Sequence, residues 1–239
     1  MFTLLAPRSA TRTVVVAVRD IYPIALASYS QGVKREGYAG EFGDFARTHV
    51  ANGLRMGRGL RALRELLSPD ELVVLHYEAI RSDLVPALLA AGGVPADSLD
   101  LSPGGSRSKP RNRSLSPGEL RLLRRVNAEF GSAYSRMLSD MLEEREGALT
   151  GGGDIDRDAL EFLSDYFEAE VEEINEAHFG GRDELKVIDP GAGGGPEPDP
   201  AEVLDDERDA ASFLLRRLAR PRSRLRHRKL RSLLRAGPT

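Results

Sequence analysis

An arginine and a serine near the start of the chain have the types and spacing of an anion-binding pair. Arg19 directly follows the apolar run Val14–Val18, and Ser28 lies in a helical stretch that begins at Pro23. A strand end followed by a helix start favours a phosphate, because free backbone N–H groups and the positive helix terminus attract an anion. A guanidinium and a hydroxyl add charge and hydrogen bonds. The alternative is that Arg19 and Asp20 are a charge pair flanking the helix, and the residues alone leave both interpretations open.

A second group of polar residues ends the apolar run that starts at Leu72: His76, Tyr77 and Glu78. A carboxylate at the carboxyl end of a strand could act as a general base, but no histidine or carboxylate partner lies nearby in the sequence. The alternative role for Glu78 is structural, bonding backbone groups or an arginine at the corner between strand and helix. Alternation sends His76 to the opposite face from Tyr77, where a core or interface histidine is expected. We therefore assign no catalytic residue.

A basic loop is the third group that could carry chemistry. Four cations interleaved with serine and glycine could close over a polyanionic ligand, or could belong to a solvated linker: Arg107, Lys109, Arg111 and Arg113. The histidines lack the spacing of metal ligands, so we predict no metal site; they are His49, His76, His178 and His227. The sequence holds no Ser-His-Asp arrangement and no Gly-x-x-x-x-Gly-Lys-Ser/Thr loop.

Strands and helices that could position these residues alternate through the first hundred residues. Two apolar runs, Val14–Val18 and Leu72–Tyr77, are predicted to be buried parallel strands. Between them we predict two helices, the second from about Asp44 to Leu67, and another helix follows Ser82 or Asp83. Alternating strands and helices are typical of an α/β fold with a parallel sheet.

The remainder of the chain is predicted to be mostly helical. Ser116 and Glu119 have capping-box spacing before a long helix, and a short apolar segment at Lys186–Ile188 could add a scrap of strand. We divide the chain into five parts: an α/β core at 1–100, a basic loop at 101–115, a helical region at 116–189, a Gly/Pro linker at 190–200, and a helix with a basic tail at 201–239.

Composition limits the class of protein. The 239 residues are 41% hydrophobic and 30% charged, so a soluble chain with a buried core is expected. The absence of cysteine excludes disulfides, thiolate catalysis and cysteine-ligated zinc. A net charge of −3 gives no global reason to expect nucleic acid. No run reaches the about 18 apolar residues of a membrane span, and the first residues do not resemble a signal peptide, so a cytoplasmic location is expected.

The order and spacing of these motifs resemble sulfotransferases that use 3′-phosphoadenosine 5′-phosphosulfate (PAPS), especially bacterial ones. The matching residues lie between Val14 and Leu142 and comprise the strand with Arg19-Asp20, the helix with Ser28-Tyr29, Phe42-Gly43-Asp44-Phe45, the strand ending in Tyr77-Glu78, and Asn112–Ser116. The resemblance implies a partial P-loop-like three-layer α/β/α core with few parallel strands, followed by a mostly helical C-terminal region.

The resemblance also implies a reaction and its ligands. A sulfuryl group would pass from PAPS to a hydroxyl or amine acceptor, with PAPS as co-substrate and without a metal. Arg19 and Ser28 would hold the 3′-phosphate of the nucleotide. The acceptor stays open, with carbohydrate as one candidate.

Two departures from the family pattern shape what we expect. The family serine usually lies eight residues after the arginine, whereas Ser28 lies nine after Arg19; Ala27 could occupy that position, with Ser30 or backbone amides as substitutes. The family loop for the 5′-phosphosulfate lies well upstream of the arginine, whereas only Met1–Thr13 precedes the strand here. We therefore expect an N-terminally truncated sulfotransferase of doubtful activity. Its few strands would have open edges, which favour poor solubility or a homo-oligomer.

A non-catalytic binding or scaffold protein is the alternative function. Residues Asp154–Glu207 are strongly acidic, whereas Arg216–Arg235 are strongly basic with leucines interleaved. A basic amphipathic tail can bind an anionic membrane surface or nucleic acid. It could also fold back on the acidic helix or stay disordered, and the sequence leaves these outcomes open.

Overall fold

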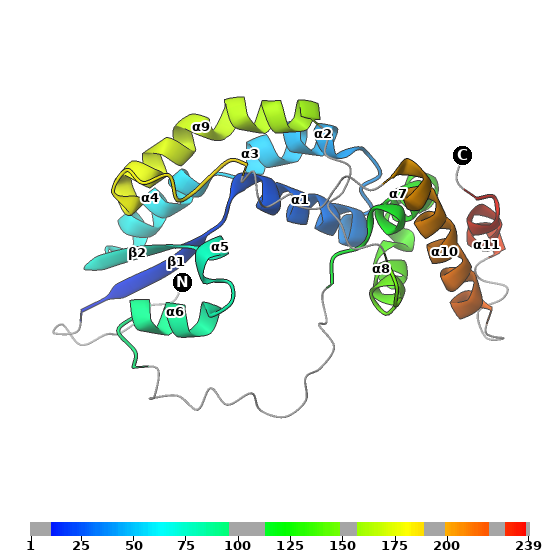
Figure 1. Cartoon of the computed structure of the whole chain (residues 1–239), viewed down its shortest axis with the longest axis horizontal. Helices are drawn as coiled ribbons and strands as arrows, with labels where there is room; N and C mark the ends of the chain where they lie inside the picture. The colour runs from blue at the N-terminus through cyan, green and yellow to red at the C-terminus, as the bar shows by residue number, and fades with distance from the viewer. Residues whose placement is uncertain (1–10, 96–112, 149–156, 189–198, 220–227, 238–239) are drawn as a thin grey trace. The chain divides into compact units, whose positions relative to one another are not determined.

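The computed structural model describes residues 11–95, 113–148, 157–188, 199–219 and 228–237 (Figure 1). The chain forms two compact units, and each is assembled from three separate segments. The first unit comprises Met1–Pro23, Ala51–Ser106 and Leu163–Ile188. The second unit comprises Ile24–Val50, Arg107–Phe162 and Asp189–Thr239. Neither unit is continuous along the chain.

A two-stranded parallel sheet lies in the first unit. Strands β1 (Thr13–Val18) and β2 (Glu71–His76) pair with Val15 opposite Val73. Both predicted strands are therefore present, built from the β-branched residues that favour strands. The prediction that both are buried on both faces is wrong, because Val18 and Val74 are their only buried residues. In the described part of the chain no third strand pairs with either outer edge, which leaves apolar surface partly exposed.

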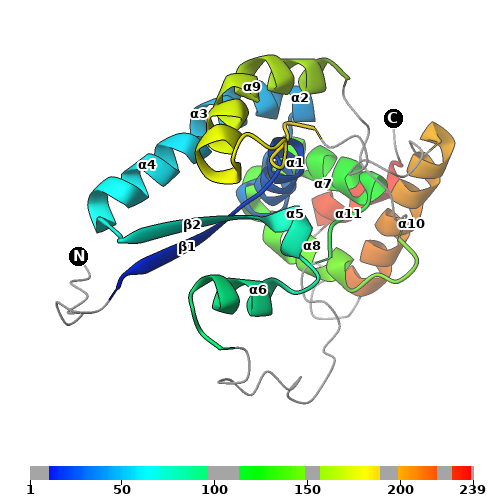
Figure 2. The same cartoon turned by 60° about the vertical axis from the view of Figure 1, so that its left-hand side comes forward.

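Helices lie on both sides of this sheet in the first unit. The C-terminal part of α9 (Arg157–Phe179) and α4 (Met56–Leu67) lie on one side, and α6 (Leu84–Ala91) lies on the other (Figure 2). A short helix, α5 (Tyr77–Ile80), follows β2 directly. A small mixed α/β unit results. The three-layer core that the family resemblance implies stays a prediction.

One predicted helix is interrupted, and another changes from α- to π-helical geometry along its length. The stretch predicted as one helix from Asp44 to Leu67 consists of α2 (Phe42–Phe45), a π-helical turn at Ala46–Val50, α3 (Ala51–Gly53) and α4. Glycine disfavours the helix interior, and the chain leaves helical structure directly after Gly53. The first helix, α1 (Ile21–Gln31), continues as a π-helical segment, Gly32–Glu36. This segment ends at Gly37, whose φ of 80° suits glycine.

The second unit is helical. Its main helices are α7 (Pro117–Phe130), α8 (Ser135–Glu143), α10 (Pro200–Leu218) and α11 (Arg228–Arg235). The predicted capping box is confirmed, because the side chains of Ser116 and Glu119 each accept a hydrogen bond from the other's backbone N–H. The long helix predicted after this capping box is interrupted at Gly131, whose backbone (φ 58°, ψ −146°) suits glycine. The mostly helical C-terminal region is confirmed for the residues described.

Two predicted segments lie mostly outside the described residues: the Gly/Pro linker at 190–200 and the basic loop at 101–115. The apolar segment Lys186–Ile188 is described and forms no strand. None of the described helices is both long and apolar enough to cross a bilayer.

Candidate functional site

The carboxyl ends of β1 and β2 bring four polar residues together in the first unit. Val18 lies opposite His76 in the parallel register, so Arg19 and Asp20 emerge at the same edge as His76 and Glu78. The His76 Nε2 atom lies 3.0 Å from Asp20 Oδ1 and 3.1 Å from Glu78 Oε2. The imidazole is therefore held between two carboxylates.

Asp20 is the most buried member of this cluster, with 1% of its surface exposed. Its Oδ1 atom accepts the backbone N–H of Lys186 at 2.8 Å, in addition to its contact with His76. Burial raises the pKa of Asp20, although the Lys186 N–H and the His76 ring oppose the shift. Asp20 thus ties the ends of both strands to the segment that follows α9.

Arg19 is held on one side and exposed on the other. Its Nε donates to Glu78 Oε1 at 3.0 Å, and its guanidinium carbon lies 5.1 Å from the centre of the Tyr77 ring. The side chain is 39% exposed. Among the described residues, neither Nη nitrogen of Arg19 has a hydrogen-bond partner. Two donors of a fixed guanidinium are therefore available to an anion.

Glu78 makes the structural contacts considered as an alternative to catalysis. One carboxylate oxygen binds Arg19, and the other accepts the backbone N–H of Asp20 at 3.3 Å. The described contacts hold no ion pair between the neighbours Arg19 and Asp20, which was the alternative to anion binding: Arg19 pairs with Glu78, and Asp20 pairs with His76. The expectation that Glu78 has no histidine partner is wrong, because His76 Nε2 lies 3.1 Å from Glu78 Oε2. His76 is accordingly a partly buried, hydrogen-bonded histidine, consistent with a core role.

The start of α1 does not offer the free N–H groups that were predicted to attract an anion. The N–H groups of Ile21 and Tyr22 donate to the carbonyls of Lys186 and Val187 at 3.1 and 2.9 Å. The prediction of free N–H groups at this helix start is wrong, because carbonyls from a segment far along the chain accept their hydrogen bonds. The Nη groups of Arg19 are the donors that remain.

Ser28 lies on α1 in the second unit, with its side chain exposed. Its alternatives also lie on α1: Ala27 is exposed and Ser30 is partly buried. The predicted partnership of Ser28 with Arg19 stays a prediction.

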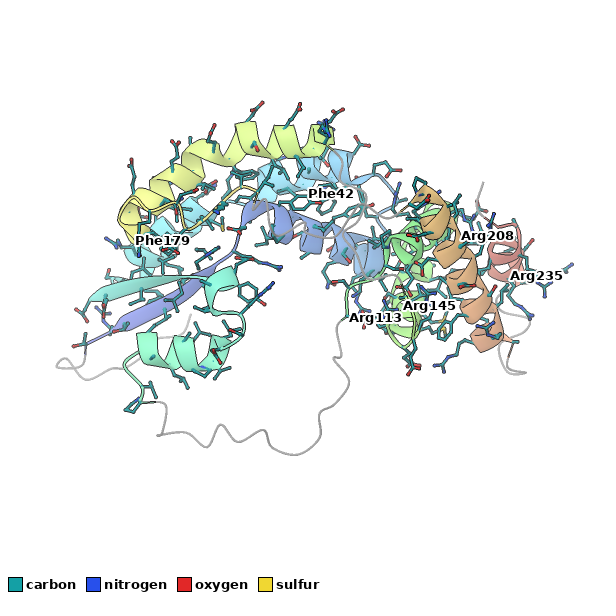
Figure 3. The ribbon with its side chains drawn as sticks, viewed as in Figure 1. Phe42, Arg113, Arg145, Phe179, Arg208 and Arg235 are labelled. Atoms are coloured by element: carbon teal, nitrogen blue, oxygen red, sulfur yellow. The ribbon has the colours of Figure 1, made fainter. Side chains whose placement is uncertain are left out.

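Arg113 is the one cation of the basic loop that the described residues include. In the second unit its guanidinium binds the Glu119 carboxylate through two hydrogen bonds of 2.8 and 2.7 Å (Figure 3). This contact gives Arg113 a structural role at the start of α7. The other three cations lie outside the described residues: Arg107, Lys109 and Arg111.

The cluster also has the donor atoms of a metal site, which the spacing of the histidines in the sequence did not predict. Asp20, His76 and Glu78 each offer one ligand atom, and these three atoms lie within 4.8 Å of one another. A ring N–H at Nε2 accounts for the contacts to both oxygens, and Arg19 already neutralises Glu78. Hydrogen bonding therefore explains the geometry, and we assign no metal to these residues.

Comparison of the chain with family models, with curated proteins and with solved structures finds no match. The family resemblance, and the roles that it implies for Arg19 and Ser28, therefore stay predictions from the sequence.

Proposed function

We propose that this chain is a sulfotransferase-type protein that binds the 3′-phosphate of PAPS through Arg19. The observation that supports the proposal is that the Arg19 guanidinium, at the carboxyl end of β1, is held in place and partly exposed. The Glu78 carboxylate binds its Nε and the Tyr77 ring packs against it, while its two Nη nitrogens have no partner among the described residues. Ligands bind at this edge in open α/β sheets. The proposal includes a cytoplasmic location and a P-loop-like three-layer core around β1 and β2.

The fixed guanidinium suits a phosphate for two reasons. Its fork can donate two parallel N–H bonds to phosphate oxygens, and charge-assisted bonds of this kind are among the strongest. Because Glu78 and Tyr77 already restrict the side chain, less conformational entropy is lost on binding. In this proposal Arg19 and Ser28 orient the nucleotide and do not touch the transferred sulfuryl group. The residues that perform the transfer and the acceptor are not assigned.

Replacing Arg19 with alanine is expected to weaken binding of adenosine 3′,5′-bisphosphate by at least about tenfold, as loss of a charge-assisted contact should. Isothermal titration calorimetry on the full chain measures the effect. Arg55→Ala is the matched control, because Arg55 is also exposed and lies over a tyrosine, 5.2 Å from the Tyr166 ring centre. Equal affinities of the wild type and Arg19→Ala would remove Arg19 from the site. A wild-type chain that does not bind the nucleotide would refute the proposed function.

Ser28→Ala should weaken the same binding by about tenfold, since a hydrogen bond to a charged group contributes about 1.5–3 kcal/mol. Ser30→Ala is the matched substitution two residues further along α1 and is expected to leave the affinity unchanged. The reverse pattern would transfer the role to Ser30.

A non-catalytic binding protein is the second candidate function. The observation that favours it is α11, which lies within the basic tail and combines buried leucines with arginines. A homo-oligomer joined through the outer edges of β1 and β2 is compatible with either candidate.

A further inference from the structure

Helix α11 has a concentrated positive charge that the rest of the described structure does not neutralise. Four of its eight residues are cationic and none is acidic; the cations are Arg228, Lys229, Arg231 and Arg235. In the described ranges, none of the four forms an ion pair within 4.0 Å. Like charges three or four residues apart on a helix repel one another and destabilise it. A bound anion would reduce this repulsion in α11.

Two leucines of α11 are buried in the core of the second unit. Leu230 and Leu234 are only 1% and 2% exposed, and they lie four residues apart, on one face of the helix. Helix α11 packs beside α10, which accounts for this burial (Figure 1). Helix α11, the described end of the tail, therefore packs on α10 through an apolar contact.

Three acidic residues of α10 pair with cations that lie outside α11. Asp206 binds Arg145, whereas Glu207 lies 3.5 Å from Arg121 and 3.4 Å from Arg125. Asp205 pairs with Arg208 at 2.7 Å on α10 itself. Among the described ion pairs, none therefore joins α10 to a cation of α11.

Three of the arginines surround a hollow on α11. Arg228, Arg231, Ser232 and Arg235 line this hollow, whose volume is about 290 Å³. These positions follow one another at helical spacing, which sets the guanidiniums along one strip of the surface. The Nε atom of Arg231 is buried and has no acceptor among the described residues. Arg235 projects outward at the end of this strip (Figure 3). We call these four residues the α11 hollow.

We propose that the α11 hollow binds the phosphate backbone of a nucleic acid. Membrane binding by an amphipathic helix requires an apolar face to insert, and in α11 that face is buried against protein. Binding to a phosphate backbone requires only a row of cations that release counterions. Arginine also matches phosphate oxygens through paired N–H donors.

The test measures binding of the full chain to a fluorescently labelled single-stranded RNA between about 50 mM and 200 mM salt, by anisotropy. The variant Arg228→Gln/Arg231→Gln/Arg235→Gln is expected to bind at least tenfold more weakly at the lower salt. Its slope of log affinity against log salt should fall by about 2, since each neutralised phosphate on a single strand contributes about 0.7. The control Arg58→Gln/Arg136→Gln/Arg157→Gln removes the same charge from exposed arginines elsewhere and should bind like the wild type.

Several results would overturn the proposal. One is an equal loss of RNA affinity in both triple glutamine variants, and another is an absence of RNA binding by the wild type. A third is that Arg228→Gln/Arg231→Gln/Arg235→Gln keeps its RNA binding but loses binding to phosphatidylserine vesicles. The variant Arg228→Lys/Arg231→Lys/Arg235→Lys guards against misfolding, because it keeps the charge and should keep the wild-type salt slope. A lysine variant that loses binding while its circular dichroism stays unchanged would also contradict binding through charge.

Discussion

Replacing Arg145 with alanine is expected to lower the free energy of unfolding by about 3–5 kcal/mol, because two buried carboxylates then lose their shared cation. Arg145 Nε donates to Glu119 Oε1 at 2.7 Å, and its Nη2 donates to Asp206. The side chains of Arg145, Glu119 and Asp206 are 7%, 0% and 4% exposed. Burial opposes the charge on Arg145, but the bonds to Asp206 and Glu119 outweigh it and raise its pKa. This contact joins α7 and α10 within the second unit.

Urea denaturation followed by circular dichroism measures this loss. Arg208→Ala is the matched control, because Arg208 also pairs with an aspartate of α10 but at an exposed position (Figure 3). Exposed pairs contribute little, so the control should change the free energy of unfolding by less than about 0.5 kcal/mol. Similar losses in the two variants would show that the buried network does not hold the helices together.

The parts of the fold that follow from local pattern could be predicted from the sequence. The β-branched runs gave β1 and β2 nearly at their boundaries, and the Ser116-to-Glu119 spacing gave the start of α7. Predictions failed where a single glycine interrupts a regular apolar pattern, as at Gly53 and Gly131. Apolar spacing continues across such a break, so it cannot show where one helix stops and the next begins.

The candidate site was only half visible in the sequence. The position of Arg19 after a strand is a local property, but its partner Glu78 lies 59 residues away. Val18 and His76 each lie at the end of an apolar run, and parallel pairing brings the ends of such strands to one edge of the sheet. The predicted parallel pairing could therefore have suggested the contact between Asp20 and His76. The carbonyls of Lys186 and Val187 that occupy the start of α1 have no local signature at all, because no motif marks them as acceptors.

Replacing Asp20 with alanine is expected to lower the free energy of unfolding by about 2–4 kcal/mol, because it leaves the Lys186 N–H and the His76 ring without their shared buried acceptor. Asp20→Asn should stay within about 1 kcal/mol of the wild type, since its amide oxygen can accept both bonds. Urea denaturation at pH 7 compares the two. An asparagine variant as unstable as the alanine variant would show that the negative charge matters, and two stable variants would show that the cluster contributes nothing.

The pH dependence of the wild type relative to Asp20→Asn gives a second readout of the same cluster. The pKa of Asp20 is raised in the folded chain, chiefly by burial, above the value of about 3.9 in an unfolded chain. Between these two pKa values the folded state binds more protons than the unfolded state. The wild type should therefore lose stability relative to Asp20→Asn as the pH rises through that interval. The opposite slope would mean that the His76 contact outweighs burial. Asp20 would then strengthen the edge that carries Arg19 through its charge as well as through its hydrogen bonds.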